Sequence, residues 1–403
     1  MDLEFLQGLI TKNETKIVLL VMDGLGGLPR EAGGKTELES AYTPHLDTLA
    51  EKSALGLSIP VLPGLTVESG PGHMGLFGYD PLEYRIGRGV LEAVGVGMEL
   101  QPSDVAVRGN YCTLDENGLV KDRRAGRIAD EISHPLSALL TIRIEDVDIL
   151  VKTVRQHRLA ILLRGPGLSA DVNDTDPLKD GLAPLELKAR TPGAEKTARI
   201  LNQFLEHAKQ VMQAYEPKSP ANMLLLRGFD NYPEIPNFSK VFGIKAAAIA
   251  VYPTYRGIAS LVGMHALSME GGTNEDEFST LEKAWNDFDF FYLHVKETDL
   301  AGEDGDFDRK VKIIEGVDQL LPRLTDLKPD VLIVTGDHST PAVLKGHSWH
   351  PVPTLIYGKY VRPDGIAEFG ECACSRGSLG IFPAMNIMPI SLANAKRINK
   401  WGG

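Results

Sequence analysis

Short apolar runs that lead into acidic or imidazole side chains constrain this chain most. The runs are residues 17–22, followed by Asp23, residues 288–295, followed by Asp299 and Glu303, and residues 331–334, followed by Asp337 and His338. Continuous apolar runs of this length are typical of strands that are buried on both faces of a parallel sheet. The sequence therefore predicts an α/β fold in which chemically active groups follow several strands of one sheet.

The ends of these predicted strands point to a metal site. In open α/β sheets, ligands bind just beyond the carboxyl ends of the strands, so the three acidic ends are expected to meet on one rim. Carboxylates that lie close together do not all stay ionised without a compensating cation. We therefore expect a pair of divalent metal ions at this rim.

Length and composition narrow the class of protein. A chain of 403 residues exceeds one typical core, so two domains are expected. The net charge of −12 argues against nucleic acid and anionic membranes as partners, since both attract basic surfaces. No apolar stretch approaches the ~20 residues of a membrane span, the first residues are acidic, and only three cysteines are present. These features favour a reducing cytoplasm and argue against a disulfide framework.

The predicted strands divide the chain into a split core and an insertion. Strand-like runs lie at 17–22, 246–252, 288–295, 331–334 and 353–357. The first of these is separated from the others by more than 200 residues, and the stretch between them has shorter runs, helices and many turns. The simplest organisation is one domain of residues 1–84 and 239–403, with a second, smaller α/β domain of residues 85–238 inserted into it.

A glycine-rich segment around Ser69 is the second informative feature. Residues 68–73 read Glu-Ser-Gly-Pro-Gly-His, so the serine suits a helix N-cap and the proline suits the first turn. A helix N-terminus welcomes phosphate, and a bound metal activates a serine hydroxyl as a nucleophile. Taken alone, the segment fits an ordinary helix start. Beside three strand ends with metal-ligand residues, it indicates a phosphoryl acceptor.

Two further sets of residues are candidates for the site. Residues 346–353 carry His347 and His350 before a strand-like run, where a histidine either ligates a metal or lies in a surface loop. In the insertion, Arg164 and Arg227 each end a strand-like run beside a glycine, a setting that suits two-pronged binding of carboxylate or phosphate. Solvated loop charge is the alternative for either arginine alone, and the presence of two favours binding.

Combined, these motifs resemble the cofactor-independent phosphoglycerate mutases, and most closely their shorter archaeal-type branch. The resemblance covers essentially the whole chain. It rests on the motifs around Asp23, Ser69, Asp299, Asp337 and His347, and on Leu168-Ser169, Asn173-Asp174-Thr175-Asp176-Pro177 and Arg227-Gly228 in the insertion. It implies the alkaline phosphatase superfamily, with a metal-binding, phosphatase-like sheet domain flanked by helices and an inserted phosphotransferase domain.

The resemblance implies a role for each matched residue. Ser69 would be the catalytic residue. The metal ligands would be Asp23, Ser69, Asp337 and His338 for one ion, and Asp299, Glu303 and His347 for the other. We expect the substrate to be bound by Arg164, Asp171, Asp174 and Arg227.

One position departs from the pattern of the family. A histidine usually stands four residues after the aspartate that matches Asp299, and this chain has Glu303 there. A carboxylate in place of an imidazole favours harder ions. We therefore expect Mn²⁺ or Mg²⁺ at the two sites, with Zn²⁺ and Co²⁺ as alternatives.

The implied activity is that of an isomerase of glycolysis and gluconeogenesis that interconverts 3-phosphoglycerate and 2-phosphoglycerate. Ser69 would accept the phosphoryl group and return it to the other hydroxyl of glycerate, so that no bisphosphoglycerate is needed. The expected partner is the small-molecule phosphoglycerate, and closure of the domains would keep water from the phosphoserine.

Three alternatives stay open at this stage. The first is a metal-dependent phosphatase or phosphotransferase for another small phosphate, such as a homoserine kinase-like member of the branch, although the chain has no nucleotide-binding loop. The second is a non-catalytic metal or phosphate-binding descendant, against which the intact Ser69 and metal ligands argue. The third is a secreted alkaline phosphatase, which the absence of a signal-like N-terminus disfavours.

Overall fold

The chain forms two compact units. The computed structural model describes residues 2–215 and 219–402, and the contacts divide the chain into Met1–Arg85 with Ile235–Gly403, here called the split unit, and Ile86–Glu234, here called the inserted unit. The domain boundaries expected from the sequence, at residues 85 and 238, lie close to these limits. That each unit folds as an independent domain stays a prediction.

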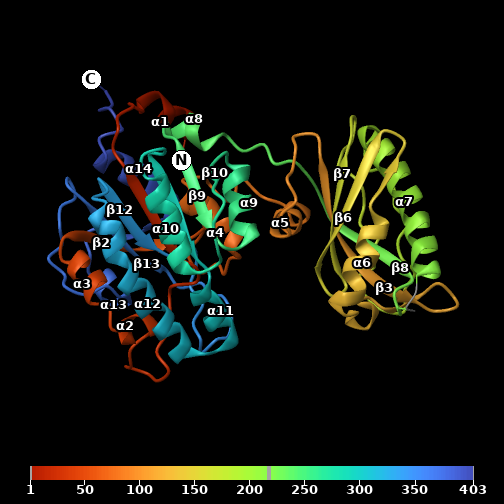
Figure 1. The fold of residues 1–403 in the computed structure, drawn as a ribbon, viewed down its shortest axis with the longest axis horizontal. Helices are drawn as coiled ribbons and strands as arrows, with labels where there is room; N and C mark the ends of the chain where they lie inside the picture. Colours follow the sequence, from red (N-terminus) through yellow and green to blue (C-terminus); the bar gives the residue numbers. More distant parts are fainter. Residues whose placement is uncertain (1, 216–218, 403) are drawn as a thin grey trace. The chain divides into compact units, whose positions relative to one another are not determined.

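An eight-stranded sheet forms the centre of the split unit as far as the structure describes it (Figure 1). From edge to edge its strands are β10 (His265–Ala266), β9 (Ala246–Ala250), β11 (Phe290–Val295), β1 (Ile17–Met22), β12 (Val331–Thr335), β13 (Val352–Gly358), β2 (Ser53–Ile59) and β14 (Gly380–Pro383). Each of the five apolar runs noted in the sequence becomes a strand. The predicted α/β architecture is therefore confirmed.

The direction of the strands gathers several chain segments at one rim of the sheet. β1 pairs in parallel with β11 and β12, and β11 pairs in parallel with β9. β13 runs antiparallel to both β12 and β2. Because β13 is reversed, its first residue lies at the same rim as the last residues of β1, β11 and β12. The loop between β12 and β13 therefore stays at that rim.

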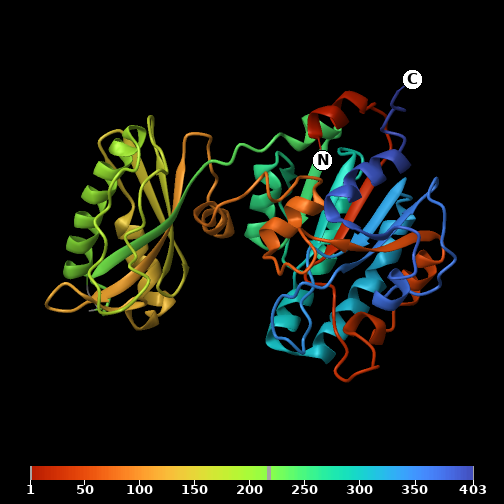
Figure 2. The same ribbon diagram turned by 180° about the vertical axis from the view of Figure 1, so that it is seen from behind.

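Helices cover both faces of this sheet (Figures 1 and 2). They are α1 (Leu3–Leu9), α2 (Glu37–Ser40), α3 (Pro44–Ala50), α4 (Ser69–Leu76), α8 (Phe238–Phe242), α9 (Pro253–Leu261), α10 (Asn274–Ala284), α11 (Glu297–Asp304), α12 (Phe307–Asp326), α13 (Glu371–Cys374) and α14 (Ile387–Asn394), with a short 3₁₀ turn at Ala384–Asn386. None of the described helices has the length and apolar character that crossing a membrane requires.

Alternate residues of the central strands enter two different layers. Val18, Leu20 and Leu293 belong to a core that also contains Phe278 of α10 and Val317 of α12. The residues between them face the opposite layer, where the ring of Tyr292 lies 4.9 Å from the ring of Phe77, just after α4. Burial on both faces explains why these strands read as continuous apolar runs.

The inserted unit is an antiparallel sheet with its own core. Its strands are β3 (Val105–Leu114), β4 (Val120–Asp122), β5 (Ile142–Ile144), β6 (Val147–Arg155), β7 (Arg158–Arg164) and β8 (Met223–Asn231). Its helices are α5 (Arg88–Gly95), α6 (Asp130–Leu140) and α7 (Glu195–Ala214), with 3₁₀ turns at Ala125–Arg127 and Pro192–Ala194. Residues of α6 and α7 pack with alternate residues of β3 and β7, so one face of the sheet carries the core.

Candidate functional site

Three buried side chains at the rim of the split unit form a first group with metal-ligand geometry. Asp23 directly follows β1, and Asp337 and His338 follow β12. Nε2 of His338 lies 3.4 Å from Oδ1 of Asp23 and 3.3 Å from Oδ2 of Asp337. All three side chains are buried, and one ligand atom from each lies within 4.8 Å of the others.

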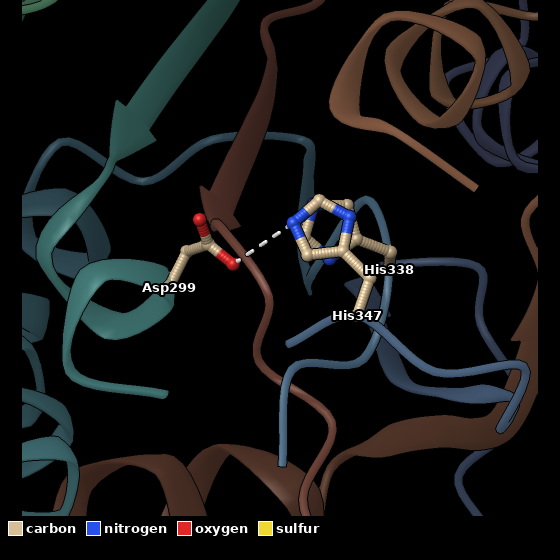
Figure 3. A group of neighbouring side chains, drawn as sticks. All are labelled: Asp299, His338 and His347. Atoms are coloured by element: carbon tan, nitrogen blue, oxygen red, sulfur yellow. Dashed lines mark ion pairs between the residues drawn. The ribbon is translucent and has the colours of Figure 1, made fainter. Parts of the chain in front are cut away.

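A second group shares His338 with the first. It consists of Asp299 on α11, His338, and His347 in the loop between β12 and β13. Nε2 of His347 lies 3.5 Å from Oδ1 of Asp299, and Figure 3 shows this carboxylate directed at the stacked rings of the two histidines. Two clusters with a common imidazole are therefore preformed by the protein alone.

Hydrogen bonds fix the tautomer of both histidines. Thr340 Oγ1 donates to Oδ1 of Asp299 over 2.6 Å, so it accepts the bond from Nδ1 of His338, which lies 3.0 Å away. Nδ1 of His347 donates to the carbonyl of Val67 over 2.8 Å. In the neutral form of each ring, the lone pair of Nε2 consequently faces the carboxylates, the orientation that metal ligation requires.

Ser69 lies beside the first group. Its Oγ is 3.1 Å from Nε2 of His338 and 3.5 Å from the hydroxyl of Tyr255, which is on α9. The structure starts α4 at Ser69, with Glu68 as the N-cap, so the expected N-cap position of the serine is wrong by one residue. The glycines that follow permit close approach, because a Cβ on Gly72 would come within 2.4 Å of the Asp337 carbonyl oxygen.

One oxygen of the Asp23 carboxylate is hydrogen-bonded, and the other has only ion-pair neighbours among the described residues. Its Oδ2 accepts a bond of 2.9 Å from Nε2 of His294 on β11, and Thr298 Oγ1 donates to its backbone carbonyl. Burial alone would raise the pKa of Asp23, but Lys296, His294 and His338 together lower it well below its ordinary value. Oδ1 of Asp23 and Oδ2 of Asp337 are buried and accept no hydrogen bond from any residue that the structure describes. Their neighbours are Nζ of Lys296, 3.4 Å from Oδ1 of Asp23, and Nδ1 of His73, 3.2 Å from Oδ2 of Asp337, so both oxygens face positions where a cation is favoured.

The loops after β1 and β12 are tied together by a buried lysine. The ammonium of Lys310, on α12, donates to the carbonyls of Gly24, Gly26 and Thr340 over 2.8, 3.1 and 2.9 Å. Gly24 has φ +61°, and a Cβ there would lie 2.5 Å from Thr340 Oγ1. A residue without a side chain is therefore required beside Asp23, both for the backbone turn and for space.

Glu303 lies at the edge of the second group. Its Oε1 is 3.7 Å from Nε2 of His347, and its side chain is half exposed. Burial and the charge of Asp299 raise the pKa of Glu303. Its carboxylate is near enough to extend the second group, although the three closest members are Asp299, His338 and His347. Its role as a ligand stays a prediction.

The inserted unit contains a different kind of site, a cavity lined by arginines. Arg108 on β3 is the direct register partner of Arg227 on β8, and Asn110 on β3 is the partner of Arg158 on β7. These residues alternate along β3 with core residues such as Val107, so they lie on the face opposite α6 and α7. The sheet register brings together residues that are far apart in the sequence.

The cavity is strongly basic. It has a volume of about 560 Å³, and its lining among the described residues includes Arg108, Arg123, Arg124, Arg127, Arg155, Arg158 and Arg227, with His157. Burial, followed by the charges of neighbouring arginines, lowers the pKa of Arg108 to about 10 and that of His157 to about 4. The buried Nε atoms of Arg108, Arg158 and Arg227 donate to no described residue. Such a cluster is suited to an anion with several oxygens.

The structure separates the two arginines that the sequence singled out. Arg227 lines the cavity and lies 3.9 Å from Asp176, which also pairs with Arg123. The guanidinium of Arg164, at the end of β7, makes a two-pronged contact with Asp104 and lies outside this lining. For Arg164, binding of substrate stays a prediction that requires the guanidinium to leave Asp104.

The two expected aspartates occupy the loop that follows β7. Oδ1 of Asp174 accepts the backbone N–H of Gly228 over 3.0 Å, immediately after Arg227. The pairing of β8 with β3 shifts at this point, and Gly228 has φ +65°, so the strand carries a bulge. Asp174 thereby helps to set the direction of Arg227. The backbone N–H of Asp171 donates to Ser169 Oγ over 3.3 Å, and nothing in its contacts tests a role in binding.

Comparisons with known proteins identify the family. The family model described as 2,3-bisphosphoglycerate-independent phosphoglycerate mutase matches residues 50–217. A protein of Aquifex aeolicus, named a probable 2,3-bisphosphoglycerate-independent phosphoglycerate mutase, is 50% identical over 411 residues, which cover 99% of this chain and 100% of the relative. This chain belongs to that family.

Solved structures agree with the membership of the phosphoglycerate mutase family. The cofactor-independent phosphoglycerate mutase of Thermoplasma acidophilum is 29% identical, with a TM-score of 0.77 over 94% of this chain and 99% of that one. A protein structure from Pyrococcus horikoshii is 31% identical, with a TM-score of 0.80 over 97% of this chain and 100% of that one. The arrangement of both units' elements thus recurs in relatives of low identity.

Several residues of this mutase-family site were not foreseen. Tyr255 and Thr340 lie in a helix and a loop whose folding brings them to the rim, whereas Lys296 directly follows β11, so the rule for strand ends could have found it. His294, on β11, is a buried partner of Asp23. The sequence does contain one indication of the cavity, because three arginines lie close together at residues 123–127.

Proposed function

We propose that this chain interconverts 3-phosphoglycerate and 2-phosphoglycerate without bisphosphoglycerate, by way of a phosphorylated Ser69. One observation carries the proposal: Ser69 Oγ lies 3.1 Å from the imidazole that two preformed metal-ligand groups share. The name of the Aquifex aeolicus relative, at 50% identity, supports the choice of substrate.

The residues present fit a pair of divalent ions. Asp23, Asp337, His338 and Ser69 would hold one ion, and Asp299, His347 and Glu303 would help to hold the other. The fit rests on two buried carboxylate oxygens that accept no hydrogen bond from the described residues, and on imidazole Nε2 atoms that already face carboxylates. When bound, such ions supply positive charge that favours an ionised serine and stabilises charge on phosphoryl oxygens. The mixed oxygen and nitrogen ligands suit Mn²⁺ or Mg²⁺, with Zn²⁺ or Co²⁺ as alternatives.

Ser69 is the phosphoryl acceptor in this proposal. Its hydroxyl loses a proton, its Oγ forms a bond to phosphorus, and the bond from phosphorus to the 3-oxygen of glycerate breaks. The released oxygen takes up a proton, which leaves glycerate and phosphoserine. The 2-hydroxyl of glycerate then attacks the phosphoserine, which restores Ser69 and yields 2-phosphoglycerate. Covalent catalysis of this kind divides a difficult transfer into two easier ones.

The arginine cavity is the natural site for the anionic groups of the substrate. Phosphoglycerate carries a phosphate and a carboxylate, and guanidinium groups bind both in a two-pronged manner. The buried, unused Nε atoms of Arg108, Arg158 and Arg227 support this assignment. We also expect these contacts to retain glycerate between the two transfers, since loss of glycerate would turn the mutase into a phosphatase.

The test is a coupled assay with the full chain, 3-phosphoglycerate and Mn²⁺, without any bisphosphoglycerate. Formation of 2-phosphoglycerate supports the proposal. Release of inorganic phosphate without 2-phosphoglycerate would instead support a phosphatase. The three cysteines are free, which fits the cytoplasmic location that glycolytic substrates require.

A further inference from the structure

Lys296 places its ammonium between the two metal-ligand groups. Nζ lies 3.4 Å from Oδ1 of Asp23 in the first group, and it forms a close ion pair with Oδ2 of Asp299 in the second. These two contacts use carboxylate oxygens, the atoms through which aspartate binds a divalent ion. One side chain therefore bridges both groups.

The lysine is held in this position by its surroundings. Its side chain is only 12% exposed, and Nζ lies 5.4 Å from the centre of the Tyr255 ring. That ring stacks at 3.7 Å on His294, which in turn donates to Asp23. Lys296 also immediately precedes α11, three residues before Asp299, so it belongs to the same rigid segment as its partner.

The ammonium of Lys296 lies beside Asp23 Oδ1, an oxygen that could otherwise bind a metal ion. This buried oxygen accepts no hydrogen bond from any described residue, and its ion-pair contacts are Lys296 and His338. Buried carboxylates need a compensating charge, and the ammonium of Lys296 contacts oxygens of both Asp23 and Asp299. This ammonium supplies one positive charge beside the two negative carboxylates.

We propose that Lys296 is a resident counter-cation that competes with divalent metal ions for Asp23 and Asp299. It stabilises the two groups when metal is absent, and it must withdraw from the carboxylate oxygens for an ion to bind them. Lys296 thus limits metal affinity and keeps the metal-free site folded. The inference rests on the proposed metal pair, but not on the identity of the substrate.

The experiment measures metal binding directly, without substrate. Mn²⁺ is titrated by calorimetry into the metal-stripped full chain and into Lys296→Met, which keeps the length of the side chain and removes its charge. The variant is expected to bind Mn²⁺ on the order of tenfold more tightly, the scale of one lost charge-assisted bond. Without metal it is expected to melt at a lower temperature than wild type, and saturating Mn²⁺ is expected to reduce this difference.

Two controls separate competition from a general effect of charge. Lys283→Met removes a lysine that is 68% exposed and pairs with Glu270, and it is expected to bind Mn²⁺ as wild type does. Lys296→Arg keeps the positive charge and is expected to show no gain in affinity. A gain in Lys296→Arg equal to that in Lys296→Met would overturn the proposal, because it would show that charge is irrelevant.

An affinity of Lys296→Met for Mn²⁺ that equals or falls below that of wild type would also overturn the proposal, whatever the melting temperatures. If Lys296→Met does not fold without metal, Lys296→Gln is titrated in its place, and the same criterion applies. A failure here leaves the mutase proposal intact, because the coupled assay tests that function separately.

Discussion

The imidazole rings of His338 and His347 stack on each other, with their centres 3.7 Å apart and their planes 24° from parallel. The two residues lie in one loop, between β12 and β13, and their Nδ1 atoms are engaged by Thr340 and Val67. Stacking and hydrogen bonding together orient both Nε2 atoms before any ion binds. Preorganisation of this kind reduces the cost of assembling a metal site.

Ser69 is predicted to be essential to mutase activity. Ser69→Ala is expected to lower turnover to below about a thousandth of wild type, the scale of loss when a nucleophile is removed. The circular dichroism and melting temperature should stay unchanged, because Ser69 only begins α4. Ser40→Ala, at an exposed position on α2, is the matched control. Intact-mass measurement of wild type during turnover should detect about 80 Da of added phosphoryl group.

Arg227 is predicted to contribute to substrate binding. Arg227→Lys keeps the charge but loses the planar fork, so KM should rise by roughly tenfold with little change in melting temperature. Arg143→Lys, an exposed change in the same unit, should leave both quantities unchanged. If the KM and turnover of Arg227→Lys equal those of wild type, Arg227 does not bind the substrate.

Arg164 is predicted to show a different response, because Asp104 binds its guanidinium. Arg164→Lys should lower the melting temperature, since Arg164 has its two-pronged contact with the buried carboxylate of Asp104. A fall in activity at temperatures where the variant is folded would support the predicted contact with substrate. Unchanged KM and turnover under those conditions would assign Arg164 to structure alone.

Glu303 is predicted to select the metal. Glu303→Ala should weaken one of the two Mn²⁺ binding events in calorimetry and leave the other, because Asp23, Asp337 and Ser69 are independent of it. Glu303→His should shift the preference in activity assays from Mn²⁺ towards Zn²⁺, a softer ion. If stoichiometry, affinity and preference all match wild type in Glu303→Ala, Glu303 is not a ligand.

Glu277, on α10, is predicted to make stability fall as the pH rises. Burial raises its pKa from 4.5 to about 9, although its Oε1 accepts the N–H of Val251. A raised pKa means that the folded state holds the proton more tightly, so this stabilisation is complete below pH 4.5 and is lost as the pH rises through about 9. A pKa that is raised by one pH unit lowers the stability of the folded state by about 1.4 kcal/mol once the carboxyl group ionises.

The measurement for Glu277 is a series of urea melts from pH 5 to pH 9. Glu277→Gln keeps the acceptor for Val251 and removes the titration, so it should unfold at higher urea than wild type at pH 8 and similarly at pH 5. Glu282→Gln, on the same helix, tests whether any lost negative charge has this effect. Parallel stability curves for wild type and Glu277→Gln would refute the assignment.

The strands that the sequence revealed are those with strongly apolar faces. β1, β11 and β12 are buried on both sides, so their composition is nearly free of polar residues. β2 and β14 escaped notice because they are rich in small residues or are very short and half exposed, although β2 pairs with β13 over six residues. The amino-acid composition of such a segment does not reveal that it pairs with a neighbouring strand.

The candidate site was predictable where side chains directly follow strands. Asp23, Asp337 and His338 are adjacent to strand ends in the sequence, so the sheet rule was sufficient for them. The arginine cavity was not predictable in the same way, since Arg108, Arg158 and Arg227 meet only through the register of three strands. The register depends on the whole sheet, and it cannot be deduced from the spacing of the arginines along the chain.

The bulge at Gly228 has a consequence for how mutations are tolerated. Arg108 pairs with Arg227, but Ala106 pairs with Asp230, so β8 advances three residues while β3 advances two. Because of this extra residue, Arg227 and Asp230 face the same side of the sheet although they are three positions apart. Deleting Gly228 would leave Phe229 alone opposite Val107, so the pairs Arg108–Arg227 and Ala106–Asp230 would both be retained and no residue would change face. The deletion would instead remove the backbone N–H that Asp174 accepts, so the bulge anchors the loop of Asp174 to β8 and does not decide which face the arginines occupy.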